Sequence, residues 1–180
     1  MKSLCSSYRQ LVIPEQVGHL SLVFQQGVYV NVTVGISLDR LLSDFWGLSS
    51  DFIEQNIQTL FLDSKPVDDL NAAIVGDRSV IALSAAMPGL VGASMRRGGY
   101  YSGMRHNISL KNQVNIRQTV HSGCIKVKLF NTLIKDMGPL LLKNGFFVKA
   151  GILQDSVPDL VKKRIDENAF VFICSDISKI

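Results

Sequence analysis

The sequence has few cysteines, and none of them lies in a spacing typical of metal binding or redox chemistry. Cys5, Cys124 and Cys174 stand alone, without a CxxC pair or a histidine at a metal-ligand spacing. A disulfide framework or a zinc site is therefore not expected. Cys124 and Cys174 lie within apolar runs, which favours buried structural thiols. This cysteine usage is typical of a reducing, cytoplasmic compartment.

The sequence also lacks an apolar stretch long enough to cross a bilayer. Its longest apolar run, Val80 to Met95, is shorter than the roughly 20 residues that a spanning helix needs, and Pro88-Gly89 interrupts it. The first residues lack the continuous apolar core of a signal peptide. We therefore expect no membrane partner.

Signatures of common enzyme classes are missing as well. No GxSxG, HExxH or kinase pattern is present, and His19, His106 and His121 have no nucleophile or carboxylate at a diagnostic spacing. The sequence therefore names no reaction and no cofactor, and whether the protein is an enzyme stays open.

Charge and hydrophobicity are those of an ordinary globular protein. Nineteen Lys and Arg residues against fifteen Asp and Glu residues give a formal charge of +4, and 47% of the residues are hydrophobic. Such a charge favours anionic partners but falls short of a basic nucleic-acid-binding tail. The apolar content is sufficient for the core of one large domain or two small ones.

The first half of the chain predicts a hairpin, a helix and two further strands. Residues 19–34 read as a β-hairpin that turns at Gln25-Gln26-Gly27, because alternate residues of its second run are valines. Ser37 is a candidate N-cap for a helix that ends near Gly47. Strands are expected over 57–62 and 80–83.

This order of elements resembles a β-grasp domain over residues 20–89, and the closest likeness is to the sulfur-carrier proteins of thiamine and molybdopterin synthesis. The segments that carry the resemblance are VTVGISLDRLL and LFLDSKPVDDLNAAIVGDRSVIALSAAMPG. The resemblance implies a mixed sheet with one helix. Sulfur carriers use a free C-terminal Gly-Gly carboxylate, whereas Pro88-Gly89 and Gly98-Gly99 are internal here. Carrier chemistry would therefore require cleavage after Gly99.

The second half predicts an alternation of strands and helices. Residues 108–120 and 124–130 read as strands, and the lysines of the second face solvent because they alternate with apolar residues. The later segments are a helix over 132–145, a strand over 146–153, a helix from 157 and a strand over 170–174. We expect an α+β protein with an arm (1–18), a β-grasp-like domain (19–105) and a smaller α/β unit (106–180).

The most unusual stretch lies between Ser79 and Arg105, where a glycine-punctuated apolar segment (87–95) leads into a basic aromatic cluster (96–105). Glycines let backbone N–H groups approach an anion, and arginines supply positive charge. Neither a GxGxxG nor a Walker pattern is present. The candidate ligand-binding residues are Gly89, Gly92, Arg96, Arg97, Gly98, Gly99, Tyr100, Tyr101, Arg105 and His106.

Several functions remain open for this stretch. Small residues also permit close packing of helices or subunits, and a long apolar run rarely stays exposed on a monomer. We therefore favour a non-catalytic binding or assembly module that forms a homo-oligomer or binds a protein partner. The alternatives are an enzyme or cofactor-binding protein that holds a phosphate or acyl ligand, and a processed sulfur-carrier precursor. Single-stranded nucleic acid stacked on Tyr100 and Tyr101 is less favoured.

Overall fold

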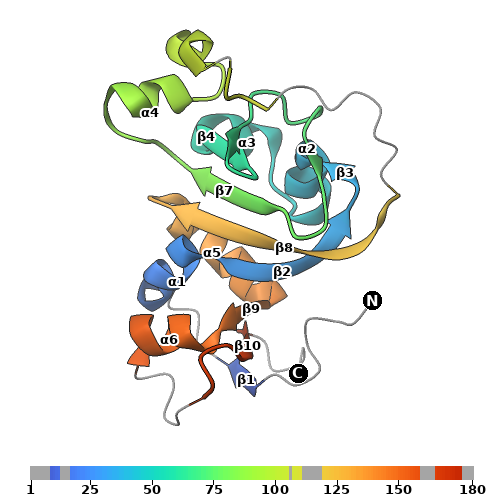
Figure 1. Cartoon of the computed structure of the whole chain (residues 1–180), viewed down its shortest axis with the longest axis vertical. Helices are drawn as coiled ribbons and strands as arrows, with labels where there is room; N and C mark the ends of the chain where they lie inside the picture. The colour runs from blue at the N-terminus through green and yellow to red at the C-terminus, as the bar shows by residue number, and fades with distance from the viewer. Residues whose placement is uncertain (1–8, 13–16, 106, 111–118, 159–164, 176–180) are drawn as a thin grey trace.

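Helices and a large mixed sheet make up the computed structural model of the chain (Figure 1), which confirms the α+β class. The structure describes residues 9–12, 17–105, 107–110, 119–158 and 165–175. Within these residues, no helix has the length and apolar character that crossing a membrane requires.

The large sheet contains eight strands in the order β1-β10-β9-β2-β8-β7-β4-β5, and β3 and β6 form a small second sheet. Neighbouring strands are antiparallel except for the parallel pairs β1 with β10 and β7 with β8. The strands are β1 (Arg9–Val12), β2 (Val28–Val34), β3 (Ile36–Ser37), β4 (Thr59–Leu62), β5 (Lys65–Pro66), β6 (Ile74–Val75), β7 (Val80–Ser84), β8 (His121–Phe130), β9 (Phe146–Lys149) and β10 (Phe170–Cys174).

The helices pack mainly on one face of the large sheet. Helices α1 and α5 contact β8, α6 contacts β9, and Figure 1 shows α5 behind the strands. The helices are η1 (Val17–Leu20), α1 (Ser21–Gln26), α2 (Leu38–Arg40), η2 (Leu41–Phe45), α3 (Ser50–Asn56), α4 (Gly89–Met95), η3 (Tyr100–Arg105), α5 (Leu133–Asn144) and α6 (Ala150–Ser156).

Strand periodicity explains why one sheet face is buried and the other is not. In β2 the four valines are buried, whereas Tyr29, Asn31 and Thr33 between them are half-buried or exposed. In β8 the same alternation buries Ile125, Val127 and Leu129. Because successive side chains of a strand point to opposite faces, all the buried residues meet the helices in one hydrophobic core.

Both halves of the chain contribute to this one sheet. The predicted domain boundary at residue 105 separates β7 from β8, yet these strands pair in parallel along Val80–Ser84. Strand β2 from the first half lies between β8 and β9 from the second. The side chains on the open face therefore come from both halves.

The predicted hairpin over residues 19–34 is wrong in its first half, which is helical. Leu20, Val23 and Phe24 are all fully buried, and their i, i+3, i+4 spacing is that of one helix face. Gly27, which was predicted as part of the turn, ends helix α1 with φ +103°. The chain reverses direction at this glycine and continues into β2. The reversal is at the predicted place, but a helix precedes it.

Other predictions for the first half are confirmed. The Ser37 hydroxyl accepts a hydrogen bond from the Arg40 amide (3.3 Å), as an N-cap does. The chain leaves this helical segment at Gly47 in the left-handed region, with φ +68°. The predicted strands over 57–62 and 80–83 correspond to β4 and β7.

In the second half the strand predicted over 146–153 ends early, because residues from Ala150 form helix α6. Ala150 and Leu153 are buried three residues apart, which a helix face explains and a strand does not. The predicted helix over 132–145 and the strands over 124–130 and 170–174 are confirmed. Of the other two predicted elements, residues 111–118 and 159–164 lie outside the described residues.

Candidate functional site

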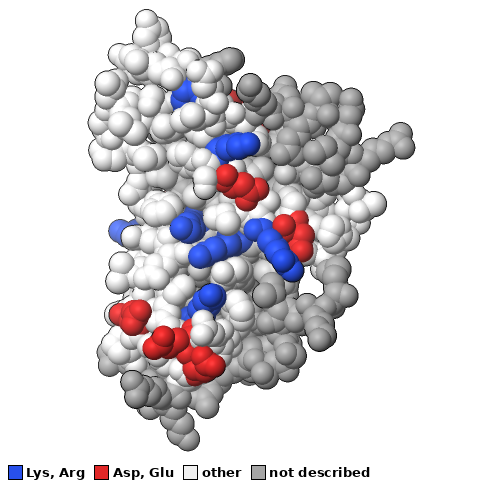
Figure 2. All heavy atoms as spheres, in the orientation of Figure 1, with Lys and Arg blue, Asp and Glu red and all other residues white. Residues whose placement is uncertain are grey.

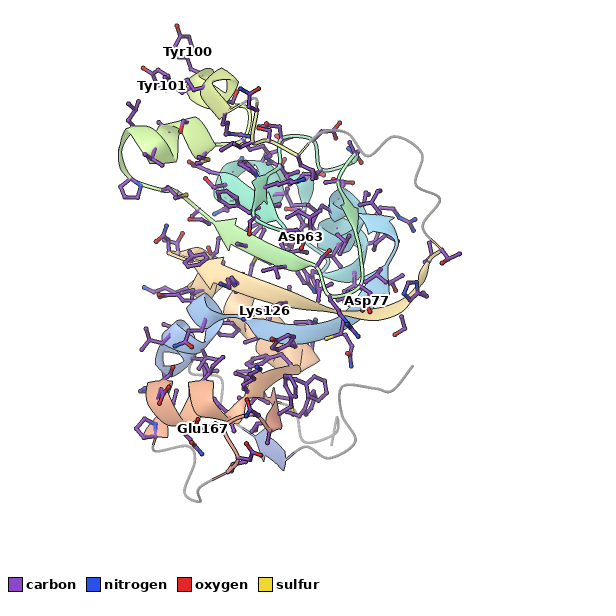
Figure 3. All side chains as sticks on the ribbon, viewed as in Figure 1. Asp63, Asp77, Tyr100, Tyr101, Lys126 and Glu167 are labelled. Atoms are coloured by element: carbon purple, nitrogen blue, oxygen red, sulfur yellow. The ribbon has the colours of Figure 1, made fainter. Side chains whose placement is uncertain are left out.

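Residues 87–105, together with 107 and 108, form a lobe, here called the projection, that stands away from the sheet (Figures 1 and 3). It contains α4 and η3, which pack against each other. Tyr100 and Tyr101 lie at its outer end, with their rings edge to face and their centroids 5.1 Å apart. The stretch that is most unusual in the sequence is thus a distinct feature of the fold.

Large apolar side chains are exposed along the projection. Leu90 in α4 is 65% exposed, Met104 in η3 is 72% exposed, and Tyr100 is 95% exposed. Exposure of one such residue is normal, but a group of them on one lobe is typical of an interaction surface. The exposed group is Met87, Leu90, Val91, Tyr100, Tyr101, Met104 and Ile108.

Arg105 holds the projection together from inside. It is 3% exposed, and both oxygens of the Asp68 carboxylate accept its guanidinium protons at 2.6 and 2.9 Å. Its other donors bond the carbonyls of Ser94 (2.7 Å) and Arg96 (3.3 Å) and the Ser109 hydroxyl (2.7 Å). All five N–H groups of this side chain therefore have acceptors within the protein.

Arg97 is also engaged by the protein. Its guanidinium donates to the Ile53 carbonyl (3.0 Å), and its backbone amide donates to the Gln58 carbonyl (2.7 Å). Burial lowers the pKa of Arg97, and the nearby carboxylates, Glu54 first, act in the opposite direction. Arg96 alone of the three predicted arginines is exposed. The structure does not gather Arg96, Arg97 and Arg105 around one open anion site.

The glycines of the projection have backbone roles. A Cβ on Gly92 would lie 1.9 Å from the Met87 carbonyl oxygen. Helix α4 can therefore pack against the segment that precedes it only with glycine at this position. Gly89 and Gly98 adopt φ values of +76° and +61°, where other residues are strained. Gly99 lies in the turn that follows α4 and donates to the Arg96 carbonyl (3.2 Å). His106 lies outside the described residues.

A cavity of about 550 Å³ beside the projection is acidic. Arg97 is its one basic lining residue, so the charge next to the predicted anion site is opposite to the expected sign. The Asp69 carboxylate in this wall accepts from the amides of Asn71 and Ala72, which is a local turn. The acidic residues of the lining are Asp39, Glu54, Asp68 and Asp69. Among the described residues no group of His, Cys, Asp and Glu could hold a metal ion.

A second surface, which the sequence analysis did not single out, is the open face of the sheet. Lys126, Lys128 and Lys149 lie on it together with half-buried aromatic rings of five strands. We call this surface the basic face. Figure 2 shows several basic side chains in the middle of the molecule with acidic side chains beside them, and Figure 3 places Lys126 there, near Asp63 and Asp77. The alternation of lysines in β8 signals an outward face, but the partners across the sheet depend on strand register.

Comparison of the chain with protein-family models, with curated proteins and with solved structures finds no match. The resemblance of residues 20–89 to the β-grasp sulfur carriers therefore stays a prediction. Function has to be argued from the projection and from the basic face.

Proposed function

We propose that this chain is a non-catalytic binding and assembly module, and that the projection is the surface through which it associates with a second copy of itself. The observation that carries the proposal is the exposure of several large apolar side chains on α4 and η3, which pack against each other, Leu90 and Met104 above all. Burial of these side chains on association is favourable, at about 25 cal/mol for each Å² removed from water.

The internal hydrogen bonds of the projection support this function. Arg105 ties α4, η3 and residues 68 and 109 into one unit, so the apolar side chains are presented on a preformed surface. A preformed surface loses little conformational entropy on binding.

The charges of the projection favour a second copy as the partner. Arg97 and Arg105 are engaged inside the protein, so Arg96 is the exposed arginine of this lobe. Two copies that meet across a two-fold axis would therefore bring little like charge together, and a surface that is mainly apolar can be self-complementary.

Sedimentation velocity tests this proposal on the purified full chain. The wild type should sediment as a dimer or larger oligomer at micromolar concentration. The double variant Leu90→Asp/Met104→Asp should sediment as a monomer, because two charges would be buried in each copy of the interface. The control is Leu22→Asp, which adds a charge at another exposed leucine, in α1 (54% exposed), and should leave the mass unchanged. A monomeric wild type at 100 μM, roughly the upper end of weak specific dimers, would contradict the proposal.

The sulfur-carrier alternative has a separate test. It requires a protein that ends at Gly99, so intact mass spectrometry of the protein from its native cell should detect that species. Such a species would replace assembly with carrier chemistry as the leading function.

A further inference from the structure

The basic face places three lysines of two strands on one side of the sheet. Lys126 and Lys128 are two residues apart in β8, about 7 Å by strand geometry, and Lys149 lies at the end of β9. Burial lowers the pKa of Lys126, and the positive charges of Lys128 and Lys149 lower the same pKa by smaller amounts. The three ammonium groups therefore share one field, and an anion would relieve their repulsion.

Within the described residues no carboxylate forms an ion pair with any of these three lysines. Figure 3 labels Asp63, Asp77 and Glu167 in this view of the molecule. The Asp63 carboxylate accepts from the Val80 amide (2.7 Å) and the Asp77 carboxylate from the Cys124 amide (2.9 Å). Gly27 makes room for the lysines, because a Cβ there would lie 2.5 Å from Lys126 Cε and 3.0 Å from Lys128 Cγ.

Aromatic rings surround the lysines. The Lys126 ammonium lies 5.5 Å from the centre of the Tyr29 ring, and Tyr29 meets Phe170 edge to face at 5.3 Å. Phe147 and Phe172 form a second ring pair, 4.9 Å apart. The register brings these rings together, because Tyr29 is opposite both Lys126 of β8 and Phe147 of β9. No pair of them is adjacent in the sequence.

A cavity lies at each end of this arrangement. The first, about 520 Å³, is mostly apolar and lies where Phe61, Lys128 and Phe130 face Met87. The second cavity, of about 400 Å³, lies between residues of β2 and β9, beside the one position at which these strands pair. Its walls include Phe45, Phe147 and Phe172. Each cavity is within or near the size range of small-ligand pockets, and each has aromatic walls.

We propose that the basic face binds single-stranded nucleic acid, with phosphates on Lys126, Lys128 and Lys149 and bases against the aromatic rings and in the two cavities. Single-strand binding combines a positive surface that follows the backbone with rings on which bases stack. The face has both components. The Asp and Glu side chains of an acidic peptide would use the lysines but carry no ring to stack, whereas every nucleotide carries a base, so the observations favour the nucleic acid.

The test is fluorescence anisotropy of a labelled 12-residue oligothymidylate titrated with the full chain at 50 and 200 mM salt. Three neutralised phosphates predict a slope of about −2 in log affinity against log salt, which weakens binding about 20-fold over this range. Lys126→Gln/Lys128→Gln should weaken binding at 50 mM salt by at least about 10-fold and reduce the slope to about −0.7. The matched control Lys135→Gln/Lys143→Gln removes two exposed lysines of α5, and its affinity should stay within twofold of the wild type.

A second variant tests the rings. Tyr29→Leu retains an apolar side chain but removes the stacking surface, and it should weaken binding by about fivefold or more. Its melting temperature identifies any loss of the fold. If Tyr29→Leu binds like the wild type and poly-glutamate of equal charge displaces the oligonucleotide equally well, the face recognises polyanions in general and the proposal is wrong.

Two other results would overturn the proposal. One is no binding at 50 mM salt with protein at 100 μM, a concentration that detects ordinary non-specific affinities. The other is equal weakening by the β8 lysine pair and by the α5 control pair. The lysines and the paired rings of the basic face lie outside the assembly surface, and the first cavity shares Met87 with it. Leu90→Asp/Met104→Asp leaves Met87 in place and should still bind the oligonucleotide, so either proposal can fail alone.

Discussion

The projection and the basic face both contain cationic side chains and tyrosines, but the fold uses the cations of the two surfaces in opposite ways. Arg105 in the projection has an acceptor for every N–H group and is 3% exposed. Lys126 on the basic face is half-buried beside two more lysines, whose charges help to lower its pKa. The first cation holds the structure together, and the second lies in a repulsive field that an anionic ligand would relieve.

This difference shows why a cluster of charges in sequence is a weak guide to a binding surface. Residues that are close in the chain, such as Arg97 and Arg105, can fold back on nearby carboxylates and carbonyls. Residues that meet through strand register, such as Lys126 and Lys149, point outward together because the sheet fixes their direction.

The largest expected effect is on the cation of the projection. Arg105→Ala removes five hydrogen bonds of a buried guanidinium, after which the Asp68 carboxylate keeps the Gly98 amide as its donor, and we expect a loss of about 3 kcal/mol in the free energy of unfolding. At this chain length the melting temperature should fall by roughly 6–12 °C. Arg96→Ala, an exposed arginine of the same lobe, should change stability by less than about 0.5 kcal/mol. Equal melting temperatures for the two variants would show that Arg105 has no structural role.

A smaller effect is expected at the glycine on which the shape of the projection depends. Gly92→Ala places a methyl group against the Met87 carbonyl oxygen and should cost about 1–3 kcal/mol. Hydrogen exchange should show faster exchange in α4 and little change in the sheet. Gly103→Ala is the control, because a Cβ at Gly103 meets nothing within 4 Å, and it should be neutral or slightly stabilising. Unchanged exchange in α4 for Gly92→Ala would contradict the close approach.

The smallest effect is expected for the stability of the basic face. Burial and like charges disfavour the protonated form of Lys126 in the folded state, while the Tyr29 ring favours it. A lowered lysine pKa means that the folded state releases this proton more readily than the unfolded state, so at neutral pH the charge does not stabilise the fold. Lys126→Met should therefore melt within about 2 °C of the wild type. A fall of more than about 5 °C would assign Lys126 a structural role instead.

Local sequence signals predicted much of the fold. The Ser37 cap, the end of the helical segment at Gly47 and the alternating lysines of β8 each depend on near neighbours, and each is found as predicted. The helical state of residues 21–26 was missed because this short run has both a strand-like composition and a helix-like spacing. The packing of residues 21–26 against α5 and β8 favours the helix over the strand.

The candidate site was predictable only in part. Apolar and glycine-rich character singled out the segment that forms the projection, because both properties lie in one continuous stretch of sequence. The partners of Arg105 could not be predicted, since Asp68 is 37 positions away. The basic face depends on the register of five strands from both halves of the chain, and no local pattern specifies that register.

The most direct test of the contrast between the two surfaces is the affinity for oligothymidylate at 50 mM salt of Lys128→Gln and Arg96→Gln. Each variant removes one positive charge, one from the basic face and one from the projection. Lys128→Gln should weaken binding about threefold or more, whereas Arg96→Gln should stay within about twofold of the wild type. Equal affinities for the two variants, or a larger loss for Arg96→Gln, would contradict the assignment of anion binding to the sheet.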